Sequence, residues 1–186
     1  MMTSKKQLHD VDASIALRDT FPKLLLDHAR QRADKPAIRE KDYGIWQTWT
    51  WSQVAEEVRD LACGLAAMGF HRGYNLAIIG DNRPRLYWAM AAAQSLGTVP
   101  VPLYQDAVAE EMVFVLNDAD VHFAVVEDQE QVDKLLEIKD RCPMLQHIIY
   151  DEPRGLRHYQ QEFLHSYEEI HALGRARSLE LDRRLR

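Results

Sequence analysis

The chain has 186 residues, of which 46% are hydrophobic and 28% are charged, and its formal net charge at pH 7 is −6. This composition supports a folded domain with a real core and excludes a disordered chain. The acidic balance repels phosphate backbones, so we expect no nucleic-acid partner.

The chain begins with residues 1–19, which we interpret as a polar leader because they contain no apolar segment of the kind found in a secretory signal. Thr20 is expected to cap a helix that starts at Phe21 and ends near Pro36, since the residue before a proline disfavours helical geometry. The alternating residues 37–40 and 45–50 predict a β-hairpin with turn chemistry at residues 41–44.

A second helix should follow the hairpin. Thr50 and Gln53 have the spacing of a capping box, in which each side chain satisfies a free backbone donor of the other. Apolar residues recur behind them at helical spacing, and Gly69 is well placed to end the helix. Gly64, Gly69 and Gly73 are interpreted as residues of a helix end and a turn.

From residue 75 onward, short apolar runs alternate with amphipathic ones. The expected strands are residues 75–80, 98–103, 121–126 and 145–150, and the expected helices are residues 84–95, 109–117 and 129–141. Residues 98–103 contain two prolines, which cannot donate to a ladder, so this strand should lie at an edge of the sheet or beside a bend. Residues 151–164 are predicted to be a loop, and residues 165–186 a helix with a weak point at Gly174.

This alternation predicts an α/β fold, with a largely parallel sheet flanked by helices and an N-terminal β-hairpin. Residues 20–150 should form its core. The uncharged run at residues 86–105 is interrupted by polar residues and two prolines, so we predict no transmembrane segment. Two lone cysteines, Cys63 and Cys142, fit a reducing compartment, and we expect a cytoplasmic protein.

A phosphate-binding loop is the first kind of site to consider, because parallel sheets bind ligands at strand ends. The sequence contains neither a GxGxxG motif nor a P-loop. Residues 80–83, Gly-Asp-Asn-Arg, join a strand to a helix, where a phosphate could sit. Asp81 would repel that anion, so we interpret the segment as a turn in which Asp81 or Asn82 caps the next helix.

Other candidate residues also favour structural roles. Cys63 is expected to be buried and inert. Cys142 adjoins Pro143 at a helix end and is at best a weak candidate nucleophile. Three histidines have spacings of seven and six residues, which cannot place two imidazoles on one helix face, and they are interpreted as surface residues: His158, His165 and His171.

Three pairs of adjacent glutamates lie on expected helices, where neighbouring side chains point in different directions and cannot act together in proton transfer. These pairs are Glu56-Glu57, Glu110-Glu111 and Glu168-Glu169. Aromatic residues are more frequent at residues 46–51 and 87–88 than elsewhere in the chain, and we interpret them as core residues rather than the lining of a ligand groove. They are Trp46, Trp49, Trp51, Tyr87 and Trp88. We therefore predict no catalytic, cofactor-binding or metal-binding residue.

Three stretches in a fixed order resemble the beginning of an AMP-forming acyl-CoA synthetase, in the long-chain fatty acid branch of the adenylate-forming ligases. They are KPAIREKDYGIWQTWTWSQVAEEV, GLAAMGFHRGYNLAIIGDNRPRLYWAMAAAQSLGTVPVPLY and AEEMVFVLNDADVHFAVVEDQEQVDKLL. The segment HSYEEIHALG also resembles a helix of that branch. Two segments depart from the commoner pattern, at residues 73–76 and 104–107.

The resemblance implies that the chain is the N-terminal part of a long-chain fatty acid–CoA ligase. Such an enzyme uses ATP, Mg²⁺, CoA and a fatty acid, and its signature motifs follow the region that this chain resembles. None of those motifs is present, so the isolated chain is expected to be inactive. Peripheral membrane contact and the oligomeric state stay open.

Two alternatives remain beside this interpretation. The first is a free-standing interaction module that descends from such an enzyme. The second is a flavodoxin-like or signalling receiver domain, which would need an acidic cluster or a phosphate loop at the strand ends; Asp81 and Asp151 alone do not supply one.

Overall fold

The computed structural model describes residues 19–184, which divide into two units at Ala55. All but the last residue of the predicted leader, residues 1–19, therefore lies outside the described residues. The first unit contains helix α2 (Phe21–Gln31) and an antiparallel hairpin of β1 (Pro36–Asp42) and β2 (Ile45–Thr50). Thr20 caps α2 as predicted, because its hydroxyl accepts a hydrogen bond from the Lys23 amide at 3.4 Å.

Helix α2 ends at Gln31, several residues before the end near Pro36 that we predicted. The backbone oxygens of Ala33 and Lys35 accept hydrogen bonds from Ser52 and Trp51, the first residues of the next helix. The hairpin turn is also tighter than predicted, because Lys41 and Asp42 still pair with β2. Only Tyr43 and Gly44 form the turn, with φ angles of 45° and 83°, as a two-residue hairpin of the primed type requires.

Helix α3 (Trp51–Ala67) opens with the predicted capping box. The Thr50 amide donates to the Gln53 side chain at 2.8 Å, and the Gln53 amide donates to the Thr50 hydroxyl at 3.4 Å. Gly69 follows the helix with φ of 93°, a conformation that suits glycine. The predicted start and stop of this helix are both confirmed.

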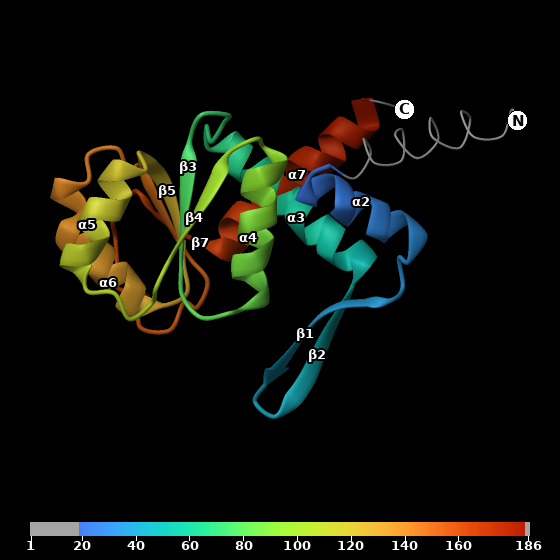
Figure 1. The fold of residues 1–186 in the computed structure, drawn as a ribbon, viewed down its shortest axis with the longest axis horizontal. Helices are drawn as coiled ribbons and strands as arrows, with labels where there is room; N and C mark the ends of the chain where they lie inside the picture. The colour runs from blue at the N-terminus through green and yellow to red at the C-terminus, as the bar shows by residue number, and fades with distance from the viewer. Residues whose placement is uncertain (1–18, 185–186) are drawn as a thin grey trace, which may run out of the picture. The chain divides into compact units, whose positions relative to one another are not determined.

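The second unit contains a five-stranded parallel sheet in the order β4-β3-β5-β6-β7. The strands are β3 (Asn75–Ile79), β4 (Val99–Leu103), β5 (Val121–Val126), β6 (His147–Tyr150) and β7 (Leu164–Ser166). The helices that begin in this unit are α4 (Pro84–Ser95), α5 (Ala109–Asp118), α6 (Gln129–Ile138), the 3-10 turn η1 (Lys139–Arg141) and α7 (Tyr167–Arg184). Helices α5 and α6 cover one face, while α4 and α7 lie on the other (Figure 1). The predicted α/β fold is confirmed.

Burial explains why the central strands read as continuous apolar runs. All six residues of β5 are buried, because β5 has a strand on each side and a helical layer on each face. One layer of the core lies under α5 and α6 and includes Met112, Leu116, Val132, Leu135 and Ile138. Strand β4 forms an edge of the sheet, which is one of the two positions that its prolines predicted.

The prediction that a helix begins at residue 165 is wrong. Residues 164–166 form β7, which pairs in parallel with β6, and the helix begins only at Tyr167. Ser166 and Glu169 form a second capping box: the Ser166 amide donates to Glu169 at 2.8 Å, and the Glu169 amide donates to the Ser166 hydroxyl at 3.2 Å. This Ser-x-x-Glu spacing is the sequence signal that the prediction overlooked.

Gly174 is also not the weak point that the sequence predicted. It is buried where α7 crosses α3, and Gly64 on α3 lies at the same crossing rather than at a helix end. A side chain at either glycine would overlap the backbone of the other helix. Glycine is needed at both positions because the two backbones approach closely.

Candidate functional site

The carboxyl ends of the parallel strands meet at one edge of the sheet. In the observed strand order, the direction of winding reverses between β3 and β5, and ligands of such sheets usually bind in the crevice at that point. Here Glu127, the residue after β5, lies in this position. Its carboxylate accepts hydrogen bonds from the Asp81 amide at 2.5 Å and from Arg83 Nε at 3.0 Å. Glu127 thus holds the loop after β3 against the end of β5.

Gly80 permits this close approach. Its φ of 150° is a conformation that side chains rarely adopt, and a Cβ at this position would lie 2.5 Å from Glu127 Cβ and 2.9 Å from Leu86 Cδ1. Gly80 could have indicated a phosphate-binding loop, but its missing side chain instead leaves room for the side chain of Glu127. Phosphate binding is disfavoured at this point, because Glu127 carries the same sign of charge as the anion.

The predicted capping of α4 by Asp81 or Asn82 is wrong. The N-cap residue is Arg83, with no side-chain cap bond, and Pro84 follows it at the first helical position. The Asn82 side chain instead accepts a hydrogen bond from the Tyr87 hydroxyl at 2.9 Å. The interpretation of the segment as a βα turn is confirmed, because it joins β3 directly to α4.

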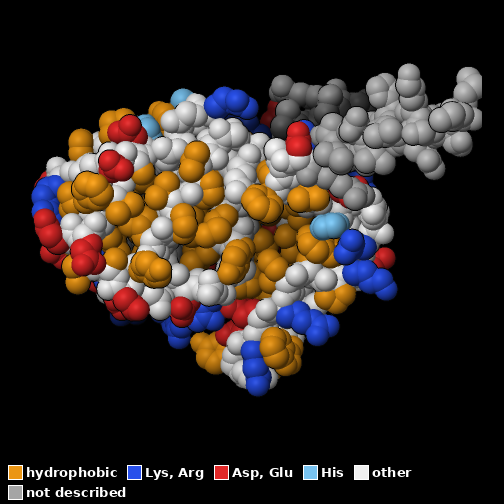
Figure 2. Space-filling model, viewed as in Figure 1, with side chains coloured by type: hydrophobic (Ala, Val, Ile, Leu, Met, Phe, Trp, Pro, Cys, Tyr) orange, Lys and Arg blue, Asp and Glu red, His pale blue; other side chains and the backbone are white. Residues whose placement is uncertain are grey.

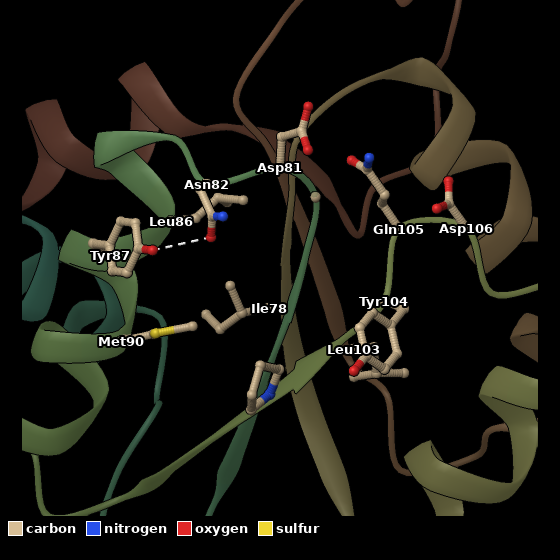
Figure 3. A pocket seen from close by; sticks show the side chains of 12 residues that line it. Ile78, Asp81, Asn82, Leu86, Tyr87, Met90, Leu103, Tyr104, Gln105 and Asp106 are labelled. Carbon is tan, nitrogen blue, oxygen red and sulfur yellow. Dashed lines mark hydrogen bonds between the residues drawn. The ribbon is translucent and has the colours of Figure 1, made fainter. Parts of the chain in front are cut away.

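A pocket of about 490 Å³ opens beside this turn, at the ends of β3 and β4 (Figure 3). Its apolar wall comes from Ile78, Leu86, Met90 and Leu103, and its polar side chains are Asp81, Asn82, Gln105 and Asp106. Apolar side chains gather on the same face over α4 and β4 (Figure 2). The pocket therefore suits a ligand with an apolar body, while its two carboxylates disfavour an anionic group nearby.

A second polar cluster surrounds Arg85 in the first turn of α4. Its guanidinium donates to Asp151 at 2.8 Å and to Glu168, and it lies 4.8 Å from the centre of the Tyr167 ring. Burial alone would lower the pKa of Arg85, but Asp151 and Glu168 outweigh it and raise that pKa. Burial also raises the pKa of Asp151, against the opposing effect of Arg85. These side chains link β6 to α4 and α7, with one guanidinium shared between two carboxylates.

The three histidines that the sequence singled out lie in three different environments. His158 is exposed beside Arg157, as predicted. His165 is half-buried, with its Nε2 atom 3.0 Å from Nδ1 of His147. His171 is 8% exposed and pairs with Glu57 at 2.8 Å, so its prediction as a surface residue is wrong. Within residues 19–184, the structure brings no three His, Cys, Asp or Glu side chains together in a group that could hold a metal ion.

The remaining candidates are separated in the structure. Cys142 is 1% exposed, and burial raises the pKa of its thiol, which makes it a poor nucleophile. Glutamates of the adjacent pairs have separate partners: Glu57 pairs with His171, Glu110 with Arg141 and Glu168 with Arg85, and Glu169 caps α7. Among the aromatic residues Trp88 is buried as predicted, whereas Trp46 is 64% exposed and Tyr87 lines the pocket.

Sequence reasoning missed Glu127 and the pocket. Glu127 directly follows a continuous apolar strand, and that position is a usable signal because it lies at the carboxyl edge of a parallel sheet. Across the described residues, we find no helix that is both long enough and apolar enough to span a membrane.

Comparison with known proteins identifies similar chains. The profile of the family described as "AMP-binding enzyme" matches residues 25–177. A long-chain-fatty-acid–CoA ligase, ACSBG2 of Xenopus laevis, is 28% identical over 145 residues, which are 78% of this chain and 20% of that protein. The ligase heimdall of Drosophila melanogaster is 28% identical over 134 residues, or 70% of this chain and 20% of that protein. The chain thus spans about a fifth of these two relatives.

Among solved structures, the fold is similar to that of the anthranilate CoA ligase AuaEII, which was crystallised with anthranoyl-AMP. The TM-score is 0.71 at 20% sequence identity, over 81% of this chain and 27% of that one. At this identity the likeness concerns the fold alone.

Proposed function

Because the chain belongs to the AMP-binding enzyme family, we propose that it forms the N-terminal part of a long-chain fatty acid–CoA ligase. In this reaction the carboxylate attacks ATP to give an acyl-adenylate and pyrophosphate, and CoA then displaces AMP to give the thioester. The observation that carries the proposal is the family match over residues 25–177, together with relatives that are ligases of this class. The alternative of a free-standing interaction module has no comparable support.

The whole enzyme would use ATP, Mg²⁺ and CoA, but the described residues at the strand ends do not fit Mg²⁺ or a triphosphate. Glu127 and Asp151 are engaged by Arg83 and Arg85, and no group of three or more metal-ligating side chains is found within residues 19–184. The acidic side chains at this edge also oppose a triphosphate. We therefore assign no residue of this chain to these groups and propose that catalysis depends on residues outside it.

We further propose that the protein acts in the cytoplasm, with at most peripheral contact to a membrane. Cys63 and Cys142 are not joined by a disulfide, which is typical of a reducing compartment. A fluorescent fusion of the whole protein that fractionates with an organelle lumen would contradict this location.

The experiment compares the purified 186-residue chain with the product of the complete reading frame. Each is incubated with a long-chain fatty acid, ATP, Mg²⁺ and CoA, and acyl-CoA and AMP are measured. We expect thioester formation only from the complete product, with one AMP released for each acyl-CoA. Thioester formation by the 186-residue chain would contradict the proposal that catalysis needs further residues. A complete product that folds and forms no acyl-adenylate from any fatty acid would contradict the ligase itself.

A further inference from the structure

His147 and His165 lie side by side on neighbouring parallel strands. His147 begins β6, His165 is the middle residue of β7, and the two strands pair through Ile149 and His165. Nδ1 of His147 is 3.0 Å from Nε2 of His165, and both side chains are half-buried. The His147 ring also contacts the fully buried Phe123 ring, with centroids 4.7 Å apart. Two imidazole nitrogens are therefore held toward each other by the sheet.

The hydrogen bond between the two rings favours ligand chemistry. One of the two facing nitrogens must accept this bond, so it carries a lone pair and no proton. A lone pair on an unprotonated ring nitrogen is what imidazole uses to bind a metal. One ring donates the present hydrogen bond. If that ring carries its proton on the other nitrogen instead, both facing nitrogens have a lone pair, and a turn of the rings can direct the two lone pairs at one ion.

We propose that His147 and His165 form a binding site for a divalent transition-metal ion such as Cu²⁺ or Zn²⁺. Metal–nitrogen bonds of about 2.0–2.1 Å and tetrahedral angles separate two ligand nitrogens by roughly 3.3 Å. From the observed 3.0 Å, the two nitrogens must separate by about 0.3 Å, and each ring must turn so that its lone pair points at the ion rather than at the other ring.

The remaining coordination positions fall to water, because no third His, Cys, Asp or Glu completes a group here within the described part of the chain. A site with two protein ligands binds more weakly than a closed structural site. By the usual order of divalent affinities, Cu²⁺ binds more tightly than Zn²⁺.

The site has a structural consequence. Strand β7 has only three residues and lies at the edge of the sheet, directly before α7. An ion shared by His147 and His165 would join this strand to β6 and stabilise the folded state by mass action. Metal binding at this pair does not depend on ligase activity.

The test titrates the metal-stripped 186-residue chain with CuCl₂, and separately with ZnCl₂, by calorimetry. The variants are His147→Gln and His165→Gln, and the control is the exposed His158→Gln. We expect wild type and the control to bind one ion that either test variant binds at least tenfold more weakly. Binding that is equal in the double variant His147→Gln/His165→Gln and in wild type would overturn the proposal.

A second measurement guards against variants that fail to fold. Electron paramagnetic resonance of the wild-type Cu²⁺ complex should show coupling to two imidazole nitrogens. Coupling to one or none, at one equivalent of Cu²⁺, would overturn the site whatever the variants do.

Discussion

Gly174 of α7 lies against Gly64 of α3 so closely that a Cβ on Gly174 would be 2.5 Å from the Gly64 amide nitrogen. The same Cβ would lie 1.7 Å from the backbone oxygen of Asp60. Beside this crossing, the buried carboxylate of Asp60 accepts hydrogen bonds from Arg175 at 3.1 Å and from Ser178 at 3.0 Å. The contact fixes α7 on α3 through backbone packing and a polar cluster on one side.

Gly174→Ala should destabilise the second unit. Helix propensity alone would favour alanine by about 1 kcal/mol, but the new methyl group overlaps backbone atoms that cannot rotate away. We expect the overlap to win, with a net loss of about 2–4 kcal/mol in the free energy of unfolding by urea. The control Ala176→Gly, on the exposed face of α7, should lose only about 1 kcal/mol. If Gly174→Ala were more stable than wild type, the backbones of α7 and α3 could not approach as closely as described.

Glu127→Ala should loosen the turn between β3 and α4. The Asp81 amide and Arg83 lose their shared acceptor, and Arg83 is partly exposed, so we expect a loss of about 1–2 kcal/mol in the free energy of unfolding. The matched control is Glu130→Ala, because Glu130 is 68% exposed and pairs with Lys134 within α6. That control should cost no more than about 0.5 kcal/mol. If both variants lost the same free energy of unfolding, Glu127 would not stabilise the turn between β3 and α4.

Asp151→Asn should change the pH dependence of stability. Burial raises the pKa of Asp151 above 3.8, so the folded state keeps this proton at pH values where the unfolded chain has lost it. The contribution of Asp151 to the free energy of unfolding is therefore largest below pH 3.8. It declines as pH rises through the pKa of Asp151 in the folded state. Asparagine does not titrate, so the variant should gain stability relative to wild type over this interval. Urea unfolding of both proteins between about pH 3.5 and 7 measures the difference. If the variant instead gained stability relative to wild type as the pH was lowered, the pKa of Asp151 would not be raised in the folded state.

Cys142 should resist thiol reagents in the folded chain. Its side chain is 1% exposed and burial raises its pKa, so little thiolate is accessible. In the variant Cys63→Ser, where Cys142 is the only remaining cysteine, reaction with a disulfide reagent at pH 8 should be slow in buffer and complete in urea. The control is Cys142→Ser, which leaves Cys63 in place. Reaction of Cys142 at the rate of a small free thiol, without denaturant, would disprove its burial.

The sequence by itself determined the elements whose signals are local. The capping box at Thr50 and Gln53, the continuous apolar strand β5 and the prolines of β4 each depend on neighbouring residues, and the structure contains each as predicted. The order of strands and helices along the chain then required parallel crossovers, which fixed the α/β class.

The tertiary structure alone decided the features that join distant segments. Three residues are too few for a periodic signal, so β7 forms because β6 offers it a partner. Gly174 could be interpreted correctly only once α3 lay across it, and His171 is buried because the same packing brings Glu57 to it. Glu127 meets the loop after β3 because β3 and β5, 46 residues apart at the Asp81 contact, are neighbours in the sheet. Local patterns fix elements because they involve backbone neighbours, whereas contacts between segments far apart depend on how those elements pack.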